Sequence, residues 1–352
     1  NSNNNVVDMN VVAANGLDGI GMSGFLFTNP TPQPRYVTLN QIYWNIVGMG
    51  VDTSTPMGNG VNGIGIGTYG DTTYGFAVDN EVIGNWIAYN GQDGIRVADF
   101  PAQFGAPYVD CYRNKLSMNN IYKNRLLGIN LGEDTVTLND PFDADSGANM
   151  LFNFPKLSNI TWNNGITRMR VDLTGLSNPA ARYVEYYRVD RDPTGYGEGM
   201  EFIKRSKFPA GTNLLIDSFF AFVPDDSITA IAWDSANWNT SEFCEVHHIR
   251  GPIQGSLSKT DVLCFGDSTG TIDLDLWWGS GYYRVFWSNG VQDSLTLTNL
   301  PMGIYTVTFQ DVVTAGGGTL TIDIMEPPRL ILNLDSTNPS CMGCSDGKLV
   351  AN

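Results

Sequence analysis

The sequence of 352 residues predicts an all-β protein. Charged residues make up only 16% of the chain, glycine occurs 39 times and aromatic residues reach 11%, a composition that suits strands and turns better than solvated helices. Single aliphatic residues separated by Asn and Gly recur in the first part of the chain, and apolar and polar residues alternate in the rest. The length exceeds that of one ordinary core, so we expect two or three domains.

One pattern of 18 residues occurs at residues 5–22 (NVVDMNVVAANGLDGIGM) and again at residues 80–97 (NEVIGNWIAYNGQDGIRV), with nine identical positions. A third copy, residues 114–131, aligns with the second at an offset of 34. A degenerate copy covers residues 37–51 and aligns at an offset of 30 with residues 7–21, matching Val37, Asn40, Ile42 and Asn45 to Val7, Asn10, Val12 and Asn15. Residues 62–66 supply a further Gly-Ile-x-Ile ending.

The shared template V-x-x-N-x-I-x-x-N-x-x-x-G-I-x-V predicts strands of two to four residues broken by turns, with Asn and Gly at turn positions that need φ > 0. One such unit cannot bury its apolar face alone, so units are expected to stack as coils around a column of Val, Ile and Leu. The structural positions of the repeat are Asn80, Val82, Asn85, Ile87, Asn90, Gly94, Ile95, Asn114, Leu116, Ile121, Asn124, Gly128 and Ile129.

Over residues 1–150 this pattern resembles the right-handed parallel β-helix family of pectate lyases, tailspikes and large bacterial surface proteins. In that family, loops between coils carry specificity, and the candidate loops here are residues 23–35, 52–61, 68–78 and 99–113. An open end of such a stack is an aggregation risk, so we expect further coils or a partner to cap it. We interpret the chain as an internal piece of a larger polypeptide that continues N-terminally with more coils.

The resemblance also includes enzymes that cut acidic polysaccharides, which need clustered Asp residues with a basic residue or paired acids. Asp18 and Asp93 occupy the same repeat position beside a turn glycine, and Arg96 lies near Asp93. A residue that recurs with the repeat is better explained by the coil than by chemistry. The sequence therefore favours no catalytic residues, and a polysaccharide lyase or hydrolase stays the alternative.

Residues 151–252 show strand alternation that predicts an antiparallel sandwich, with Met169, Val171 and Leu173 on one face of a strand. The segment resembles the small Ig-like domain that follows β-helices in secreted bacterial proteins, on the residues Asn153-Phe154-Pro155, Asp192–Gly199 and Trp238–Phe243.

Two acidic clusters are candidate calcium ligands, because calcium prefers hard oxygen ligands. The first is Asp190, Asp192 and Glu198 on a Gly-rich turn, and the second is Asp140, Asp143 and Asp145. Simple Asx-type turns are the other reading of both clusters. Calcium is the only cofactor that the sequence brings into consideration.

Residues 256–328 predict a second sandwich, with an Asn289-Gly290 hairpin turn after Trp287. Leu300–Tyr305 resembles the corner of Ig-type sandwiches in which a Tyr hydroxyl ties a turn, so the hydroxyl of Tyr305 is expected to do so here. CFGDSTGTIDLDL, VFWSNG, LTLTNLPMGIYTVTFQD and MEPP resemble the SprB repeat, named for a gliding-motility adhesin of Bacteroidota, and a second copy begins in residues 329–352. The late Cys of that repeat is missing, which leaves Cys264 without its expected partner. At Cys341 and Cys344 the sequence favours a local disulfide or two free thiols over a metal site.

Trp277, Trp278, Tyr282 and Tyr283 surround glycines, where exposed rings would stack on sugars and buried rings would fill the core. The formal net charge of −16 is spread over the whole chain and argues against nucleic acid as a partner, and no apolar run is long enough to span a bilayer. The resemblances imply type IX secretion to the cell surface. They also imply a structural or adhesive role, with neighbouring modules, surface glycans or other copies of the chain as partners.

Overall fold

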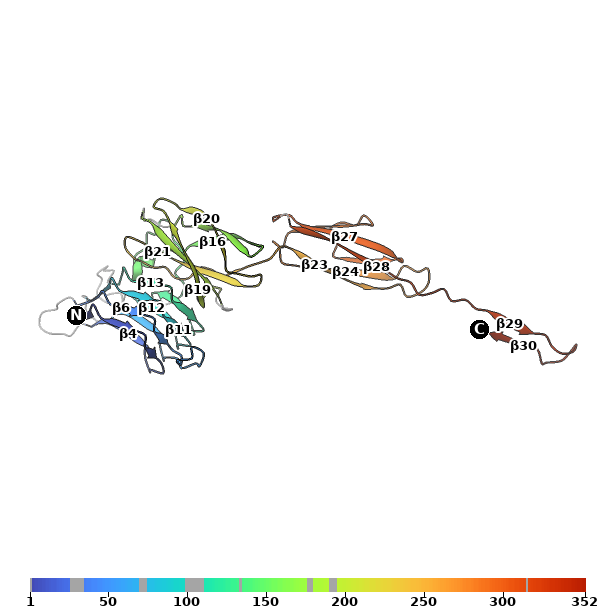
Figure 1. The fold of residues 1–352 in the computed structure, drawn as a ribbon, viewed down its shortest axis with the longest axis horizontal. Helices are drawn as coiled ribbons and strands as arrows, with labels where there is room; N and C mark the ends of the chain where they lie inside the picture. The colour runs from blue at the N-terminus through green and yellow to red at the C-terminus, as the bar shows by residue number, and fades with distance from the viewer. Residues whose placement is uncertain are drawn as a thin grey trace. The chain divides into compact units, whose positions relative to one another are not determined.

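The computed structural model describes residues 2–25, 35–69, 75–98, 111–132, 135–175, 180–189, 195–314 and 316–352. These residues form strands, turns and one short 3-10 segment, η1 (Ala148–Leu151), and contain no α-helix, so this part of the chain is all-β. The chain divides into two compact units, Asn1–Gly251 and Pro252–Asn352. Figure 1 shows the first unit in blue to yellow and the second in orange to red.

The first part of unit 1 passes repeatedly through the same set of parallel sheets, and we call each passage a coil. Coil 1 holds β1 (Ser2–Asn3), β2 (Val6–Asp8), β3 (Val11–Val12) and β4 (Ile20–Phe25). Coil 2 holds β5 (Arg35–Thr38), β6 (Gln41–Tyr43), β7 (Ile46–Val47) and β8 (Ile64–Tyr69). Coil 3 holds β9 (Gly75–Val78), β10 (Glu81–Ile83), β11 (Trp86–Ala88) and β12 (Ile95–Ala98). Coil 4 holds β13 (Lys115–Ser117), β14 (Asn120–Tyr122) and β15 (Ile129–Leu131).

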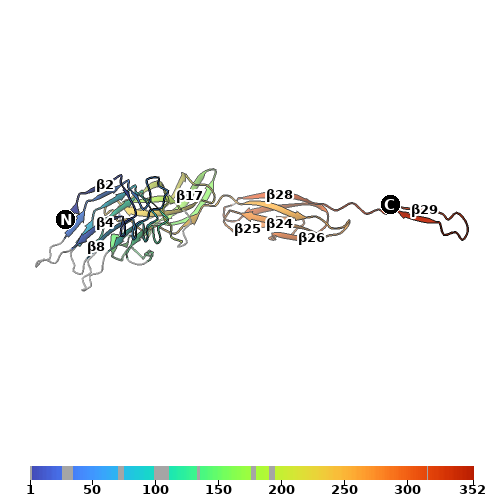
Figure 2. The same ribbon diagram turned by 90° about the horizontal axis from the view of Figure 1, so that it is seen from below.

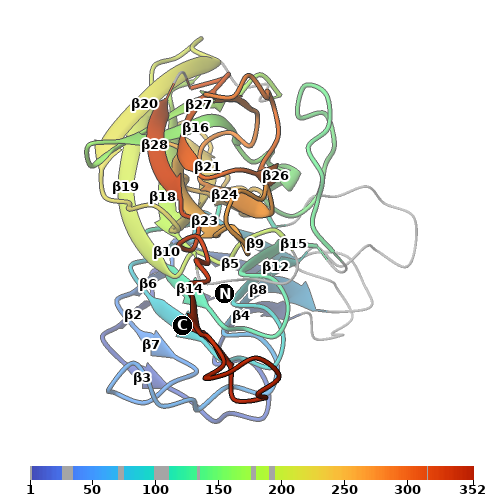
Figure 3. The same cartoon turned by 90° about the vertical axis from the view of Figure 1, so that its right-hand side faces the viewer.

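Equivalent strands of successive coils pair in parallel, so that equivalent aliphatic residues lie one above another. Val82 pairs with Ile42 on one side and with Leu116 on the other, while Ile87 pairs with Ile121 and Ile95 with Ile129. Figure 3 shows β2, β6 and β10 on one side of the stack and β4, β8, β12 and β15 on the other. The repeat residues Val82, Ile87, Ile95, Leu116, Ile121 and Ile129 are at most 2% exposed, so burial of this column accounts for the period of the sequence.

The predicted alignment of the degenerate copy is wrong by five residues. Ile42 pairs with Val7 and Val37 with Ser2, an offset of 35 and not 30. The coil ends at Ile64, which pairs with Ile20 and Ile95, and not at Gly48–Val51. The error arose because Asn recurs every five residues inside each coil, so a shift of five superposes Asn on Asn equally well.

The predicted role of Asn and Gly at φ > 0 is also corrected. The left-handed residue is the one before each repeated Asn, such as Met9, Trp44 and Tyr89 with φ of 55°, 56° and 61°. Gly94 is required for a different reason, since a Cβ there would lie 2.4 Å from Cγ2 of Ile121 in the next coil. Close packing between coils therefore selects this glycine.

Parts of three predicted loops, residues 26–34, 70–74 and 99–110, lie outside the described residues, whereas the predicted loop at residues 52–61 is described throughout. Two predicted loop segments are partly strand: β4 continues to Phe25 and β5 begins at Arg35 within residues 23–35, and β8 continues to Tyr69 and β9 occupies Gly75–Val78 within residues 68–78. Figure 2 shows the coil strands stacked from blue to green.

The second part of unit 1 is an antiparallel sandwich. One sheet holds β16 (Lys156–Asn163), β17 (Ile166–Asp172) and β20 (Leu214–Phe220), and the other holds β19 (Glu201–Phe208), β18 (Arg182–Arg188), β21 (Ser227–Asp234) and β22 (His247–His248). Met169, Val171 and Val184 fill the core between the sheets. The opposite face of β18 and β21 is not solvated, because Tyr187 and Ile231 belong to the core of the coils. The sandwich therefore packs on the coil stack.

Unit 2 contains a second sandwich, with sheets of β23 (Gln254–Thr260), β24 (Gly270–Trp277) and β26 (Thr296–Leu300), and of β25 (Tyr283–Trp287), β27 (Gly303–Asp311) and β28 (Gly317–Ile324). The Tyr305 hydroxyl donates to the carbonyl of Pro301 at 3.1 Å, which confirms the predicted corner. The Asn289-Gly290 turn is present, but the strand at residues 296–300 joins the opposite sheet and not β25.

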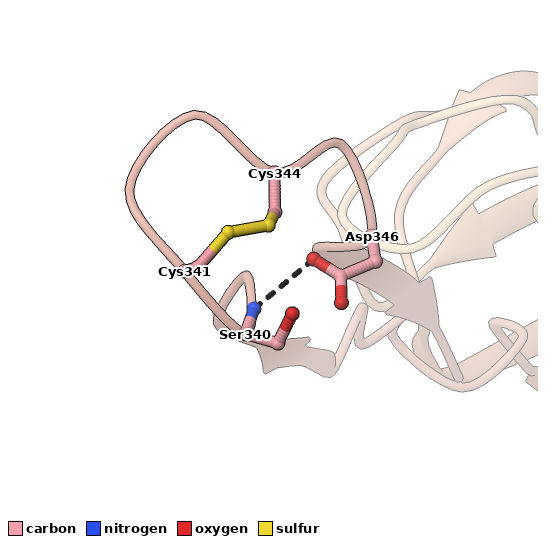
Figure 4. Close-up of a disulfide and its surroundings, with 4 residues drawn as sticks. All are labelled: Ser340, Cys341, Cys344 and Asp346. Carbon is pink, nitrogen blue, oxygen red and sulfur yellow. Dashed lines mark hydrogen bonds between the residues drawn. A yellow bond between two sulfur atoms is a disulfide. The ribbon is translucent and has the colours of Figure 1, made fainter.

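Beyond these sheets, β29 (Leu334–Thr337) and β30 (Lys348–Ala351) pair with each other. Cys341 and Cys344 form a disulfide in the loop between the two strands, and the Ser340 amide donates to Asp346 at 3.0 Å (Figure 4). Of the alternatives left open by the sequence, the local disulfide is the one formed. Cys264 is free and exposed.

Candidate functional site: the polar ladders of the coils and their acidic cap

Asparagine side chains form hydrogen-bonded ladders through the coils. In the first ladder, Asn5 donates through Nδ2 to Oδ1 of Asn40 at 2.8 Å, Asn40 to Asn80 at 2.9 Å and Asn80 to Asn114 at 2.9 Å. The second ladder joins Asn10, Asn45, Asn85 and Asn119. The third joins Asn15, Asn59, Asn90 and Asn124. A buried amide is tolerated here because each rung satisfies both of its polar ends.

These three ladders have a direction. At each rung the backbone N–H and the Nδ2 of one Asn donate to the Oδ1 of the Asn in the next coil, as Asn85 does to Asn119 at 3.0 Å and 3.0 Å. Donors therefore point toward coil 4 and acceptors toward coil 1. The end of the stack at coil 4 consequently needs acceptors.

Glu185, in the middle of β18, supplies acceptors at that end. Its carboxylate accepts from the Met118 amide at 2.8 Å and from the Ser117 hydroxyl at 2.6 Å. Arg205 Nε and Trp233 Nε1 donate to the same carboxylate at 2.8 and 3.0 Å. Glu185 is fully buried, and these donors balance the cost of burying its charge.

Two further glutamates serve the other sides of coil 4. Glu198 accepts from the amide and the Nδ2 of Asn124, at 3.1 and 3.0 Å, and so ends the third ladder. Glu242 accepts from the Leu131 amide through Oε1 and from the Thr137 amide through Oε2, both at 2.8 Å. We call Glu185, Glu198 and Glu242 the acidic cap.

Neutral side chains beside the acidic cap also accept hydrogen bonds from coil 4. Asn149 accepts from the Asn114 amide at 3.0 Å and ends the first ladder, while Thr240 Oγ1 accepts from the Leu116 amide at 3.0 Å. Burial raises the pKa of Glu242 to about 7, although the hydrogen bonds from Leu131 and Thr137 oppose this rise. The cap thus contains a carboxyl group that titrates near neutral pH.

The candidate calcium ligands of the Gly-rich turn divide between described and undescribed residues. Asp190 and Asp192 lie outside the described part of the chain. Glu198 is 8% exposed, and its carboxylate is engaged by Asn124 as described above. In this position it acts as an acceptor for the ladder.

Asp140, Asp143 and Asp145 offer ligand atoms that lie within 4.8 Å of one another. Oxygen ligands at this separation could hold a calcium ion. They also make turn hydrogen bonds, since the Ala144 amide donates to Asp140 at 2.9 Å and the Asn153 amide to Asp143 at 2.9 Å. Burial and the neighbouring acids raise the pKa of Asp143 to about 6.

The acids considered for catalysis on the coils serve the coils. Asp18 accepts from the Asn62 amide and Nδ2 at 3.0 Å each. Asp93 is fully buried and accepts from the Leu127 amide at 3.0 Å and from Asn130 Nδ2 at 3.1 Å. Burial raises the pKa of Asp93, and the hydrogen bonds lower it in part. Both carboxylates are therefore engaged by neighbouring coils.

One acid–base group does lie on the outer side of the coils, where Tyr43 donates to Glu81 and Lys115 Nζ lies 3.7 Å from Glu81. Burial and Glu81 raise the pKa of Tyr43, whereas a tyrosine base would need a lowered pKa. Lys115 lies 4.8 Å from the ring centre of Trp233, under the sandwich. This arrangement suits packing better than proton transfer.

An apolar stripe runs along the outer side of the coils. The ring of Trp44 lies on Gly84, where a Cβ would be 2.5 Å from Cε3, and yet Trp44 is 55% exposed. Trp86, two residues after Gly84, is 39% exposed, and Ile46 is its partner in coil 2. Met9 and Val11 extend the exposed apolar positions in coil 1. We call Met9, Val11, Trp44, Ile46 and Trp86 the aromatic stripe.

The aromatic residues predicted in unit 2 divide between surface and interior. Trp277 and Tyr282 are 43% and 71% exposed, so filling of the core does not explain them. Trp278 and Tyr283 are half-buried. Asp311 ties this turn together by accepting from the Ser280 hydroxyl at 2.8 Å and from the Val313 amide at 2.8 Å. The turn therefore presents two rings to solvent.

Sequence reasoning missed the acidic cap. Glu185 stands between Val184 and Tyr186 in an alternating strand, where it looks like a solvated position. Tyr187, two residues after Glu185, and β21, which is buried along its whole length, indicate that both faces of β18 are covered. A charged residue in such a strand indicates a buried acceptor with specific donors.

Comparisons with known proteins assign the chain to no family. No family model matches the chain, and no curated protein matches it. Among solved structures, the FN1–FN3 domains of chicken CNTN1 match with a TM-score of 0.25 and 14% identity, over 50% of this chain and 67% of that one. The Ig1–Ig3 ectodomain of mouse nectin-like molecule 4 matches with a TM-score of 0.28 and 13% identity, over 50% of this chain and 65% of that one. The described residues hold no helix with the length and apolar character to cross a membrane.

Proposed function

We propose that the chain is a non-catalytic structural and adhesive module of an extracellular surface protein. In this proposal the four coils are a right-handed parallel β-helix, the sandwich of unit 1 is an Ig-like connector, and unit 2 is a SprB-type repeat followed by the start of another. Export to the surface of a Bacteroidota cell by type IX secretion, as for gliding adhesins, belongs to the same proposal.

The observation that carries the adhesive role is the aromatic stripe. Trp44 and Trp86 are held on a regular backbone, since the strands on either side pair in register across coils 2 and 3. Trp44 is fixed by close contact with Gly84 while more than half of its side chain stays exposed. Rigid exposed rings lose little entropy on contact and suit flat apolar faces such as those of sugar rings.

The alternative, a polysaccharide lyase or hydrolase, is weakened by the use of the coil acids. Asp18 and Asp93 accept hydrogen bonds from neighbouring coils, and Lys115 lies against Trp233.

Binding to a glycan array and to purified surface polysaccharides, together with a cleavage assay on the same polysaccharides, tests the proposal on the full chain. We expect binding without cleavage, and a loss of affinity of about tenfold or more for Trp44→Ala/Trp86→Ala, since each ring contributes on the order of 1 kcal/mol. Leu126→Ala/Leu138→Ala is the matched control, because both leucines are exposed apolar residues of unit 1 outside the stripe. Equal binding by both double variants would remove the stripe from the proposal, and cleavage would establish the enzyme alternative.

A further inference from the structure

The outer side of coil 1 differs from that of coil 4. Among the described residues, each strand of coil 1 is the last strand of its sheet and pairs only with coil 2. Val7, Val12 and Ile20 are only partly buried, whereas their partners Ile42, Val47 and Ile64 are at most 1% exposed. Coil 1 thus leaves the aliphatic column open at one end.

The hydrogen-bond pattern of coil 1 defines which groups can bind to this end of the stack. Asn10 donates its amide and Nδ2 to Asn45, at 3.0 and 3.1 Å, and Asn15 donates to Asn59 at 3.1 and 2.8 Å. In coils 2 to 4 the corresponding Oδ1 accepts two donors from the coil before it, as Asn85 Oδ1 does from Asn45. Within the described chain, the Oδ1 atoms of Asn10 and Asn15 have no such pair of donors. Both side chains are exposed.

We propose that the outer side of coil 1 is an interaction surface for one more polypeptide coil of the same type, which adds its strands to β2, β3 and β4. The coil must carry Asn at five-residue intervals, so that its backbone N–H and Nδ2 groups donate to Asn10 and Asn15. Its aliphatic residues cover Val7, Val12 and Ile20. This inference rests on the scaffold part of the proposed function and is independent of the aromatic stripe.

A second copy of the chain fits this surface poorly. Two coil 1 faces placed against each other would set Oδ1 acceptors of Asn10 and Asn15 against acceptors, with no donor between them. The opposite end of the stack, which has the right donors, is covered by Glu185, Glu198 and Glu242. Only a coil with free donors on its facing side is complementary.

The test is an extended full chain in which a copy of residues 75–110 is placed directly before Ser2. This insertion keeps the 34-residue spacing that separates Asn80 from Asn114, so the copied Asn85 and Asn90 lie in register with Asn10 and Asn15. Hydrogen exchange is measured by mass spectrometry for residues 6–20 and for unit 2. The matched control carries Asn85→Asp and Asn90→Asp in the copy only, which replaces each amide donor by an acceptor.

We expect exchange of residues 6–20 to slow by about tenfold or more in the extended chain, by much less in the Asp control, and by nothing in unit 2. Unchanged exchange in coil 1 would overturn the proposal. So would equal protection by the Asp control, because donor polarity would then have no role. If the unextended chain sediments as a dimer in which exchange of residues 6–20 is slowed, the surface binds a second copy of the chain and not a further coil. Glycan binding through Trp44 and Trp86 is unaffected by any of these outcomes and fails or succeeds separately.

Discussion

The Glu185 carboxylate, in the sandwich, accepts a hydrogen bond from the Met118 amide, in the last coil, at 2.8 Å. The two residues are 67 positions apart: Met118 lies in the third copy of the repeat, and Glu185 lies outside the repeat altogether. This bond matters because strand edges with free amides recruit other strands. The sandwich therefore ends the coil stack by offering acceptors to a surface of donors.

Removal of the Glu185 carboxylate should weaken the packing of the sandwich on the coils in unit 1. In Glu185→Ala, Arg205, Trp233 and the Met118 amide lose their acceptor in a buried site, and we expect a loss of about 3–5 kcal/mol in the free energy of unfolding of unit 1. Urea unfolding followed by tryptophan fluorescence measures it. The control is Glu201→Ala, which breaks the ion pair between Arg188 and Glu201. Because the Glu201 side chain is 51% exposed, this variant should lower the free energy of unfolding by less than about 1 kcal/mol. Equal losses in the two variants would show that the Glu185 carboxylate stabilises unit 1 no more than an exposed ion pair does.

The coils could be predicted from the sequence because each aliphatic position recurs with the stacking period. The register of coil 2 could not be fixed in the same way. Asn40 and Asn45 match any pair of repeat Asn residues at a distance of five, and an insertion separates Asn45 from the third ladder residue, Asn59. Only pairing of Ile42 with Val7 in three dimensions distinguishes the alternatives.

The acidic cap was beyond sequence reasoning for a different reason. The alternation of β18 separates Val184 and Tyr186, which lie in one core, from Glu185 on the opposite face, but it does not show what covers that face. That face is covered by coil 4, which is distant in sequence, so local alternation carries no information about it. Glu198 and Glu242 lie in segments between strands, where acids are ordinarily solvated, and their donors are likewise far along the chain.

Loss of an internal rung of a ladder should be costly. Asn85 accepts from the Asn45 amide and Nδ2 and donates to Asn119 and to the Ile42 carbonyl, all in buried positions. We expect Asn85→Ala to lower the free energy of unfolding of unit 1 by about 2–4 kcal/mol, since several buried groups lose partners. Asn10→Ala, at the exposed end of the same ladder, should cost about 1 kcal/mol or less. Chemical denaturation of both variants gives the comparison, and similar costs would contradict the ladder argument.

Glu242 should make the stability of unit 1 fall as the pH rises toward neutrality. Its pKa is about 7 in the folded chain and about 4.5 when unfolded, so the folded state binds the proton more tightly. The resulting stabilisation is complete below pH 4.5 and is lost as the pH rises through 7, with a total of roughly 3 kcal/mol.

Urea unfolding from pH 4.5 to 8 for the wild-type chain and Glu242→Gln measures this contribution. The amide side chain of this variant does not titrate, so the difference between the two unfolding free energies should vary with pH over that window. Asp143, with a pKa of about 6, contributes with the same sign in both chains and cancels from the difference. A difference that is constant with pH would show that Glu242 is ionised throughout.

The cysteines should differ sharply in reactivity toward an aromatic disulfide reagent under native conditions. Cys264 is free and exposed, whereas Cys111 and Cys244 are buried, and burial raises the pKa of Cys244 to about 11. Because the thiolate is the reactive form, we expect one thiol to react rapidly and two to react only after denaturation. Cys341 and Cys344 are joined and should stay silent without a reductant. Cys264→Ser should abolish the rapid phase, and a rapid phase that survives in this variant would place Cys111 or Cys244 within reach of solvent and contradict the packing of unit 1.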